Sequence, residues 1–448
     1  MPVERATRQA WLVWTIAVAV YLAAVFHRTS LGVAGLAAAA RFGVGPAALG
    51  VFTVLQVGVY AAMQVPTGLL VDRFGPRRML TAAALLLGSG QLLFAVAHSY
   101  PLGLVARAVV GFGDALTFVS VLRLVAAHFP AWRYPMVVSL TTALGAAGNL
   151  ISTVPLTLAL DGLGWTWTFV AVGAATLGYA TLAGTRLRDV PAGVPVPAKT
   201  PVPLRAVLRQ VHQAWRVPGT RLGFWVHFST MSTPTVLGLL WGLPYLVRAQ
   251  GFSPRLASTV LGVLVIGQIV GNPVVGSLTG RRPELRMPLV VGFLATAITT
   301  WAVLLGWPGG RVPAAVIVCA FALLSLGGPV SAIAFALARD YNPIHRVGTA
   351  TGVANVGGFV ATTVASLGVG VLLGLVDAWA PAAGFRMALL SVAAVLLVGT
   401  CRVAVWWRRA RAAVFAAEAR GEAVPVHLRR TRWDATPDEP ARELQPAA

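Results

Sequence analysis

The chain has 448 residues, of which 57% are hydrophobic and 11% are charged, and its mean hydropathy is +0.76. Soluble domains carry about 25% charged residues, so this composition excludes a water-soluble globular protein. The net charge of +21 raises nucleic-acid binding as an alternative, which depends on where the cations lie.

Long apolar stretches recur along the whole chain. A bilayer core about 30 Å thick requires roughly 20 mostly apolar residues per helix, and twelve stretches meet that length, three of them interrupted by a few charges. The predicted spans cover residues 11–36, 42–71, 79–106, 102–126, 134–160, 162–185, 222–247, 256–280, 287–310, 312–338, 347–376 and 385–407. We therefore predict an all-α polytopic membrane protein with six spans in each half.

The segments between and after the halves are polar or rich in proline. The predicted parts are an N-terminal bundle (1–185), a linker (186–221), a C-terminal bundle (222–407) and a largely disordered basic tail (408–448). From residue 204 the linker turns amphipathic, which is typical of a helix at the membrane surface. The apolar stripe of that helix comprises Leu204, Val207, Leu208, Val211 and Trp215. Trp406 and Trp407, followed by Arg408, indicate a membrane exit.

The cations are distributed unevenly between the two sides of the membrane. With the N-terminus inside, 18 Lys and Arg residues before the tail fall on the cytosolic side. The opposite side holds five: Arg41, Arg248, Arg255, Arg311 and Arg386. The positive-inside rule then places both termini and the linker in the cytosol of a bacterial cell. Orientation in the lipid bilayer, not binding of nucleic acid, therefore explains most of the basic charge. We also expect the protein to be a monomer.

No cofactor or metal site is predicted. Cys319 and Cys401 lie within spans without metal-ligand spacing and are interpreted as buried, inert thiols. The stretch 193–200 nearly spells a phosphate-binding loop, but Ala198 replaces its second glycine and Pro195 and Pro197 remove amide donors.

The two halves echo each other, as expected of a transporter built from repeats. Phe26–Ser30 in the first span parallels Val226–Thr230 in the seventh. Gly68–Arg78 after the second span parallels Gly276–Arg286 after the eighth.

The loop after the second span carries the strongest motif. It reads G-L-L-V-D-R-F-G-P-R-R, with its defined positions at Gly68, Asp72, Arg73, Gly75, Arg77 and Arg78. It resembles the loop between helices two and three of the major facilitator superfamily. The resemblance implies that Asp72 faces the positive N-terminal end of the eleventh helix, near Gly348, as a conformational latch. In the second copy Gly280 stands where an Asp is expected, which predicts a weaker latch there.

A second family signature, R-x-x-x-G-x-G in the fourth helix, is matched by Arg107, Gly111 and Gly113, with Asp114 next. The eleventh span, Gly348–Gly358 with Asn355, looks like the small-residue helices that line or flank the path in organic-anion members. Glycine-rich packing without a ligand role is an equal alternative for it.

Buried charges are costly, roughly 2.5 to 3.5 kcal/mol each on insertion scales, and mark functional sites. The intramembrane set is Arg28, Arg107, Arg123, Arg402 and Asp114. In the family fold, helices one, four, seven and ten line a central cavity, which implies a cavity role for Arg28, Arg107, Asp114, His27 and His227.

Each of these residues also has a structural interpretation. Arg123 and Arg402 can serve as snorkelling anchors. A permanent pair between Arg107 and Asp114 is the alternative to a coupling role, and the histidines can be satisfied polar residues.

The predicted function is secondary transport of a small solute by alternating access, coupled to protons. Because intramembrane Arg exceeds Asp, a small organic or inorganic anion is favoured. Arg28 resembles the first-helix Arg of organic-anion members, although Phe228 stands where a second clamp residue is expected in the seventh helix. Efflux of a lipophilic or cationic drug, with Asp114 as the cation partner, remains the alternative. A non-transporting sensor is more remote, and the sequence shows no motif of an enzyme.

Overall fold

The computed structural model describes residues 7–44, 46–152, 154–191, 204–376, 381–422, 424 and 428. Secondary structure in these residues is helical throughout. Among them, nine helices are long and apolar enough to cross a membrane. Helix α2, helix α6 and the run from α9 to η2 complete the set of twelve spans. The predicted all-α, polytopic fold class is confirmed.

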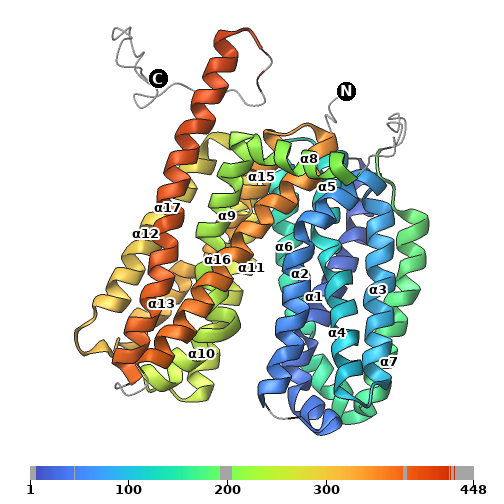
Figure 1. The fold of residues 1–448 in the computed structure, drawn as a ribbon, viewed down its shortest axis with the longest axis vertical. Helices are drawn as coiled ribbons and strands as arrows, with labels where there is room; N and C mark the ends of the chain where they lie inside the picture. Colours follow the sequence, from blue (N-terminus) through green and yellow to red (C-terminus); the bar gives the residue numbers. More distant parts are fainter. Residues whose placement is uncertain are drawn as a thin grey trace.

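The N-terminal half forms one bundle (Figure 1). Its helices are α1 (Arg8–Phe42), α2 (Pro46–Phe74), α3 (Pro76–Val96), α4 (Tyr100–Ala115), α5 (Thr117–His128), α6 (Tyr134–Ile151) and α7 (Val154–Arg186). α4 and α5 together make the fourth span, interrupted at Leu116. α7 contains the end of the fifth span and the whole sixth span, which meet at Gly164, where the left-handed φ of 72° allows the chain to turn.

The C-terminal half forms the second bundle. Its segments are α9 (Pro218–Val236), η1 (Leu237–Trp241), α10 (Gly242–Pro244), η2 (Tyr245–Ala249), α11 (Pro254–Arg281), η3 (Pro283–Leu285), α12 (Arg286–Gly306), η4 (Pro308–Gly310), α13 (Ala314–Ser325), α14 (Gly327–Ser331), α15 (Ile333–Asp340), η5 (Ile344–Arg346), α16 (Val347–Leu375) and α17 (Pro381–Ala419). The tenth span consists of α13, α14 and α15 in succession. The connecting helix α8 (Leu204–Arg216) lies across the end of the molecule that carries both termini (Figure 1).

The halves meet mainly at that same end, here called the terminal end, and diverge toward the opposite end (Figure 1). Close contacts between halves join α2 to α16 and α6 to α11. A Cβ at position 68 would lie 2.6 Å from the carbonyl oxygen of Gly348, and one at position 276 would lie 2.8 Å from that of Pro135. Small residues therefore allow the two halves to close on each other here.

One expectation, the burial of the two cysteines, is corrected by the structure. Cys319 and Cys401 are exposed on the outer faces of their helices rather than buried; apolar residues in a membrane span face lipid as readily as protein. α17 continues as one helix to Ala419, past the end of the last predicted span at residue 407. Most residues beyond Glu422 lie outside the described residues.

The amphipathic helix predicted in the linker is present as α8. The side chains of Leu204, Val207 and Leu208, which form most of its stripe, lie outside the described set. At its end, Gln213 accepts a hydrogen bond from Arg346 at 3.0 Å. α8 thus contacts the beginning of α16 at the terminal end.

Candidate functional site

A cavity of about 190 Å³ lies between the two halves. The N-terminal half contributes Tyr21, Val25, Arg28, Tyr60, Phe118, Thr142, Gly145, Ala146 and Asn149 to its lining. The C-terminal half contributes His227, Met231, Pro234, Thr235, Gln268, Asn272, Gly328, Ser331, Phe335, Asn355 and Phe359. Arg28 is the basic side chain among these described lining residues. The cavity thus combines one cation with amides, hydroxyls and aromatic rings.

Arg28 on α1 is paired with Asp114 on α4. Its Nε donates to Oδ2 and its Nη2 donates to Oδ1, each at 2.7 Å. The Arg28 side chain remains 26% exposed, whereas that of Asp114 is fully buried. The guanidinium also lies over the ring of Tyr60, at 4.5 Å from the centroid. One edge of Arg28 is therefore bound to the acid while the side chain still reaches the cavity.

Arg107 and His27 lie behind this pair and do not line the cavity. Arg107 is fully buried and donates to the carbonyl oxygens of His27 at 3.1 Å and Arg28 at 3.3 Å. The ring nitrogens of His27 interact with Gln91 at 3.1 Å and with Thr176 at 3.0 Å. The alternative of a direct pair between Arg107 and Asp114 is not what the structure has, because the Asp114 carboxylate accepts from Arg28 on α1. Both residues hold α1 in place.

His227 and Asn355 line the C-terminal side of the cavity. Within the described residues, neither ring nitrogen of His227 has a partner with good hydrogen-bond geometry, and the ring packs against Phe335 with centroids 4.9 Å apart. Asn355 on α16 donates to the side-chain oxygen of Gln64 on α2. Phe228 is buried against Trp225 and lies outside the lining. Phe228 therefore offers the cavity no second cation beside Arg28 for a two-arginine clamp on an anion.

Asp72 at the end of α2 caps α16 of the other half. Its Oδ1 accepts from the amide of Gly348 at 3.0 Å, and its Oδ2 accepts from both the amide and the hydroxyl of Thr349 at 2.7 Å. A carboxylate at a helix N-terminus satisfies free amides and complements the helix dipole. This is the contact that the loop motif implies. Arg123, interpreted from sequence as an anchor, lies 3.4 Å from Asp72 instead and compensates its charge.

The other motif residues shape the turn between α2 and α3. Gly75 has a φ of 87°, which strongly favours glycine, and lies against the Asp189 carboxylate. That carboxylate also accepts from the amide of Arg77 at 2.8 Å, while the Arg77 side chain donates to the carbonyl of Gly184 at 2.7 Å. Arg73 lies over the ring of Phe74, and Arg78 is exposed. Arg77 therefore fastens the turn to the end of α7 and the residues after it, in the same half.

The second copy of the motif uses a different arrangement. Gly280 at the end of α11 is directly against the carbonyl of Trp132, which leaves no room for an aspartate. Asp340 pairs instead with Arg286 and, at 3.8 Å, with Arg339. Arg339 lies over the Tyr134 ring of the opposite half, 5.1 Å from its centroid. The acidic side chain on this side thus belongs to α15 rather than to α11.

The glycines of the fourth-helix signature are packing positions. A Cβ at position 111 would lie 2.7 Å from the carbonyl oxygen of Gln56, and one at position 113 would lie 2.9 Å from the amide of Leu87. They allow α4 to approach α2 and α3 closely, which positions Asp114 opposite α1.

Sequence reasoning missed most of the neutral lining. Tyr21, Tyr60, Phe118, Asn149 and Gln268 carry no charge, so a search for intramembrane charges does not find them. Amides within apolar spans are the signal that could have indicated two of them, Asn149 and Gln268.

Two six-helix halves, joined by a linker that contains α8 and enclosing a polar cavity with a buried charge pair, define a membrane transporter built from two repeats. The family model of the Major Facilitator Superfamily matches residues 15–362 and 224–436. The chain belongs to the Major Facilitator Superfamily.

Curated relatives and solved structures agree with this family. The chain is 24% identical to a probable sulfoacetate transporter of Cupriavidus necator over 58% of this chain and 63% of that protein. It is 33% identical to a quinolone resistance transporter of Acinetobacter baumannii over 35% and 37% of the two chains, so these first matches span less than two thirds of either relative. A probable galactarate/D-glucarate transporter of Escherichia coli is 23% identical over 83% and 88%. Among solved structures, the proton:xylose symporter XylE has the same fold, with a TM-score of 0.66 at 15% identity over 91% and 97% of the chains.

Proposed function

We propose that this protein transports a small organic anion together with a proton, with Arg28 as the anion ligand and Asp114 as the proton site. The bidentate contact between these two side chains at the cavity wall is the observation that carries the proposal. The bilayer and a small-molecule substrate are the partners, and the protein acts as a monomer.

The pair of Arg28 and Asp114 couples binding of the proton to binding of the anion, because the net charge of the site must stay neutral. While Asp114 is ionised it occupies the guanidinium of Arg28, and the site is neutral. Protonation of Asp114 removes that partner, so a carboxylate or sulfonate entering the cavity can take over the guanidinium in the same bidentate manner. The site is again neutral. Because an uncompensated buried charge is costly, the proton and the anion bind together.

The cavity lining favours an anion that also carries hydroxyl groups or an apolar face. Asn149, Gln268 and Asn272 offer amide donors and acceptors, and Tyr60 and Phe359 pack against each other with centroids 4.9 Å apart across the halves. The names of the sulfoacetate and galactarate/D-glucarate transporters agree with an acidic substrate.

Drug efflux is the second candidate, because a local match joins the chain to the quinolone resistance transporter. In that case Asp114 would bind a cationic group. The present pairing disfavours this, since a cation at Asp114 would leave Arg28 without its partner in the cavity.

Uptake into proteoliposomes tests the proposal. The panel contains sulfoacetate, galactarate, D-glucarate and a quinolone, with and without an imposed pH gradient. We expect accumulation of at least one acid that collapses when the gradient is removed. Accumulation of the quinolone alone, or uptake of an acid that ignores the pH gradient, would overturn it.

A further inference from the structure

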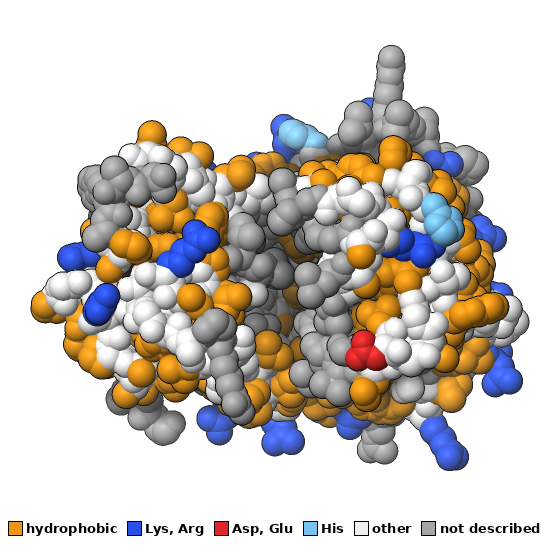
Figure 2. Space-filling model, turned by 90° about the horizontal axis from the view of Figure 1, so that it is seen from below, with side chains coloured by type: hydrophobic (Ala, Val, Ile, Leu, Met, Phe, Trp, Pro, Cys, Tyr) orange, Lys and Arg blue, Asp and Glu red, His pale blue; other side chains and the backbone are white. Residues whose placement is uncertain are grey.

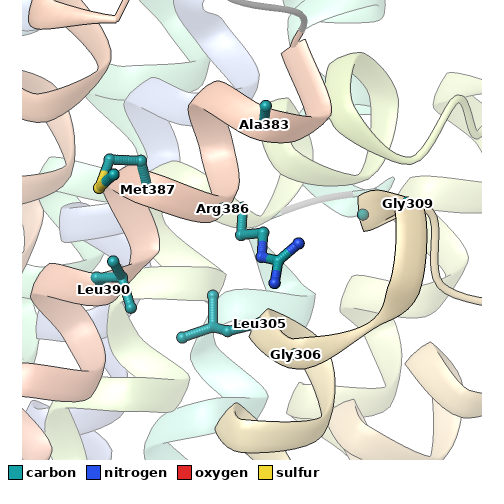
Figure 3. Close-up of a pocket in the computed structure, with 8 residues that line it drawn as sticks. Leu305, Gly306, Gly309, Ala383, Arg386, Met387 and Leu390 are labelled. Atoms are coloured by element: carbon teal, nitrogen blue, oxygen red, sulfur yellow. The ribbon is translucent and has the colours of Figure 1, made fainter.

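A second, larger pocket opens on the outer surface of the C-terminal half, far from the central cavity. It lies between α12 and α17 at the end opposite the termini (Figure 3). Its lining consists of Leu305, Gly306, Gly309, Gly310, Ala383, Arg386, Met387 and Leu390. Nothing in the transport mechanism above uses this groove.

The polarity of the groove changes with depth in the membrane. Arg386 lies beside the point where α12 ends, with its guanidinium directed toward the Gly306–Gly309 turn (Figure 3). Trp307 follows directly on α12, and tryptophan marks the membrane–water interface. Leu390 is one helical turn further into the membrane, about 6 Å at 1.5 Å per residue, and Leu305 precedes the end of α12. The cation is therefore at headgroup depth and the apolar wall at acyl-chain depth.

Arg386 is exposed, and none of the ion pairs between described residues involves it. Among the described residues, none of those that line the groove is acidic. The surrounding surface is also cationic, since Arg248 and Arg311 are exposed at the same end of this half. Figure 2, which views this end, shows basic groups on a mostly apolar and uncharged surface.

We propose that this groove binds an anionic phospholipid of the adjoining leaflet, with its phosphate on Arg386 and an acyl chain against Leu305, Met387 and Leu390. Charge complementarity selects this occupant: a cation at headgroup depth above an apolar groove matches the polarity of a lipid. A second copy of the chain would bring the same arginines together at this surface, which disfavours a dimer contact here. The inference depends on the membrane-spanning fold and not on the transport proposal.

Native mass spectrometry of the full-length protein tests the site. The probes are phosphatidylglycerol, phosphatidylcholine with the same acyl chains, and soluble glycerophosphoglycerol. We expect one tightly held phosphatidylglycerol on the wild type. Arg386→Gln should weaken it about fivefold, as expected for one arginine at a membrane surface.

Two further variants separate a groove from general surface charge. A Cβ at Gly306 meets no atom within 4 Å, so the backbone there accepts a side chain, and Gly306→Leu should occupy part of the groove and also displace the lipid. Arg311→Gln removes an equal charge outside the lining and should change little. An equal loss in Arg311→Gln, equal retention of phosphatidylcholine, binding of the soluble headgroup alone, or a dimer that depends on Arg386 would each overturn the proposal.

Discussion

Arg28 and Asp114 form a bidentate contact between α1 and α4, with both nitrogen to oxygen distances at 2.7 Å. Removing one partner of a buried pair leaves an uncompensated charge and typically costs 3 to 5 kcal/mol. The cavity beside Arg28 supplies a place where a substrate anion can replace the lost partner. Changes at the two residues should therefore have opposite consequences for coupling and binding.

Asp114→Asn should abolish accumulation driven by a pH gradient while substrate exchange continues. The amide cannot bind and release a proton, yet it leaves Arg28 free for an anion in every state. Uptake and counterflow in proteoliposomes measure the two activities separately. Asp161→Asn, a change at an exposed aspartate, is the matched control.

Full accumulation by Asp114→Asn would remove Asp114 as the proton site. Loss of expression together with both activities would show instead that the pair serves only to hold α1 against α4.

Arg28→Lys should weaken the apparent affinity for the anion by about tenfold or more. An ammonium is a point charge and cannot reproduce two parallel hydrogen bonds to an oxyanion, and charge-assisted bonds contribute about 1.5 to 3 kcal/mol. Concentration dependence of uptake measures this, with Arg8→Lys on the exposed start of α1 as control. An unchanged affinity for a proven anionic substrate would refute the role of Arg28.

Hydropathy and charge were sufficient to predict the fold, because a bilayer imposes helix length and the loops carry the cations. The resemblance of the loop to the family motif also implied the contact of Asp72 with the start of α16, which the structure shows. Most span boundaries agree with the structure to within a few residues. The exceptions include the span predicted over 79–106, because α3 ends at Val96, and the last span, because α17 continues to Ala419.

The cavity could be predicted only in part, for reasons of helix geometry. His27 and Arg28 are neighbours, so they lie about 100° apart around α1, and sequence does not reveal which one faces the cavity. Arg107 and Asp114 share a face but are separated by about 10 Å, so the partner of Asp114 had to come from another helix. That choice depends on packing of α1 against α4, which periodicity does not encode.

Asp72→Asn should shift the transporter away from the state closed at the terminal end. It removes a charged acceptor from the amides of Gly348 and Thr349 at nearly constant volume, a loss of roughly 1 to 3 kcal/mol. Spin labels on the terminal ends of α2 and α16 should report longer distances. Wild-type distances and wild-type flux at equal expression would show that the contact is no latch.

The linker and both termini are predicted to be cytosolic. A cysteine at Pro195, which lies outside the described residues, should resist a membrane-impermeant maleimide in intact cells and react after permeabilisation. One at Asp161, exposed at the opposite end, should react in intact cells. Cys319 and Cys401 are both exposed and must first be replaced by serine. Labelling of position 195 in sealed cells would reverse the orientation.

Gly68→Ala should open the terminal end in the same direction as Asp72→Asn, but by sterics rather than charge. A Cβ at position 68 would lie 2.6 Å from the carbonyl oxygen of Gly348 and 2.9 Å from the Cα of Thr349. Both atoms belong to backbone, so the halves must separate to admit it. Gly58→Ala on the same helix is the matched control, because a Cβ there meets no atom within 4 Å. The same spin-label distances between α2 and α16 measure the effect. Because both changes disrupt one contact, the double variant Gly68→Ala with Asp72→Asn should lengthen these distances by less than the sum of the two single effects. Strict additivity, or an equal shift in Gly58→Ala, would show that the two residues do not act on one interface.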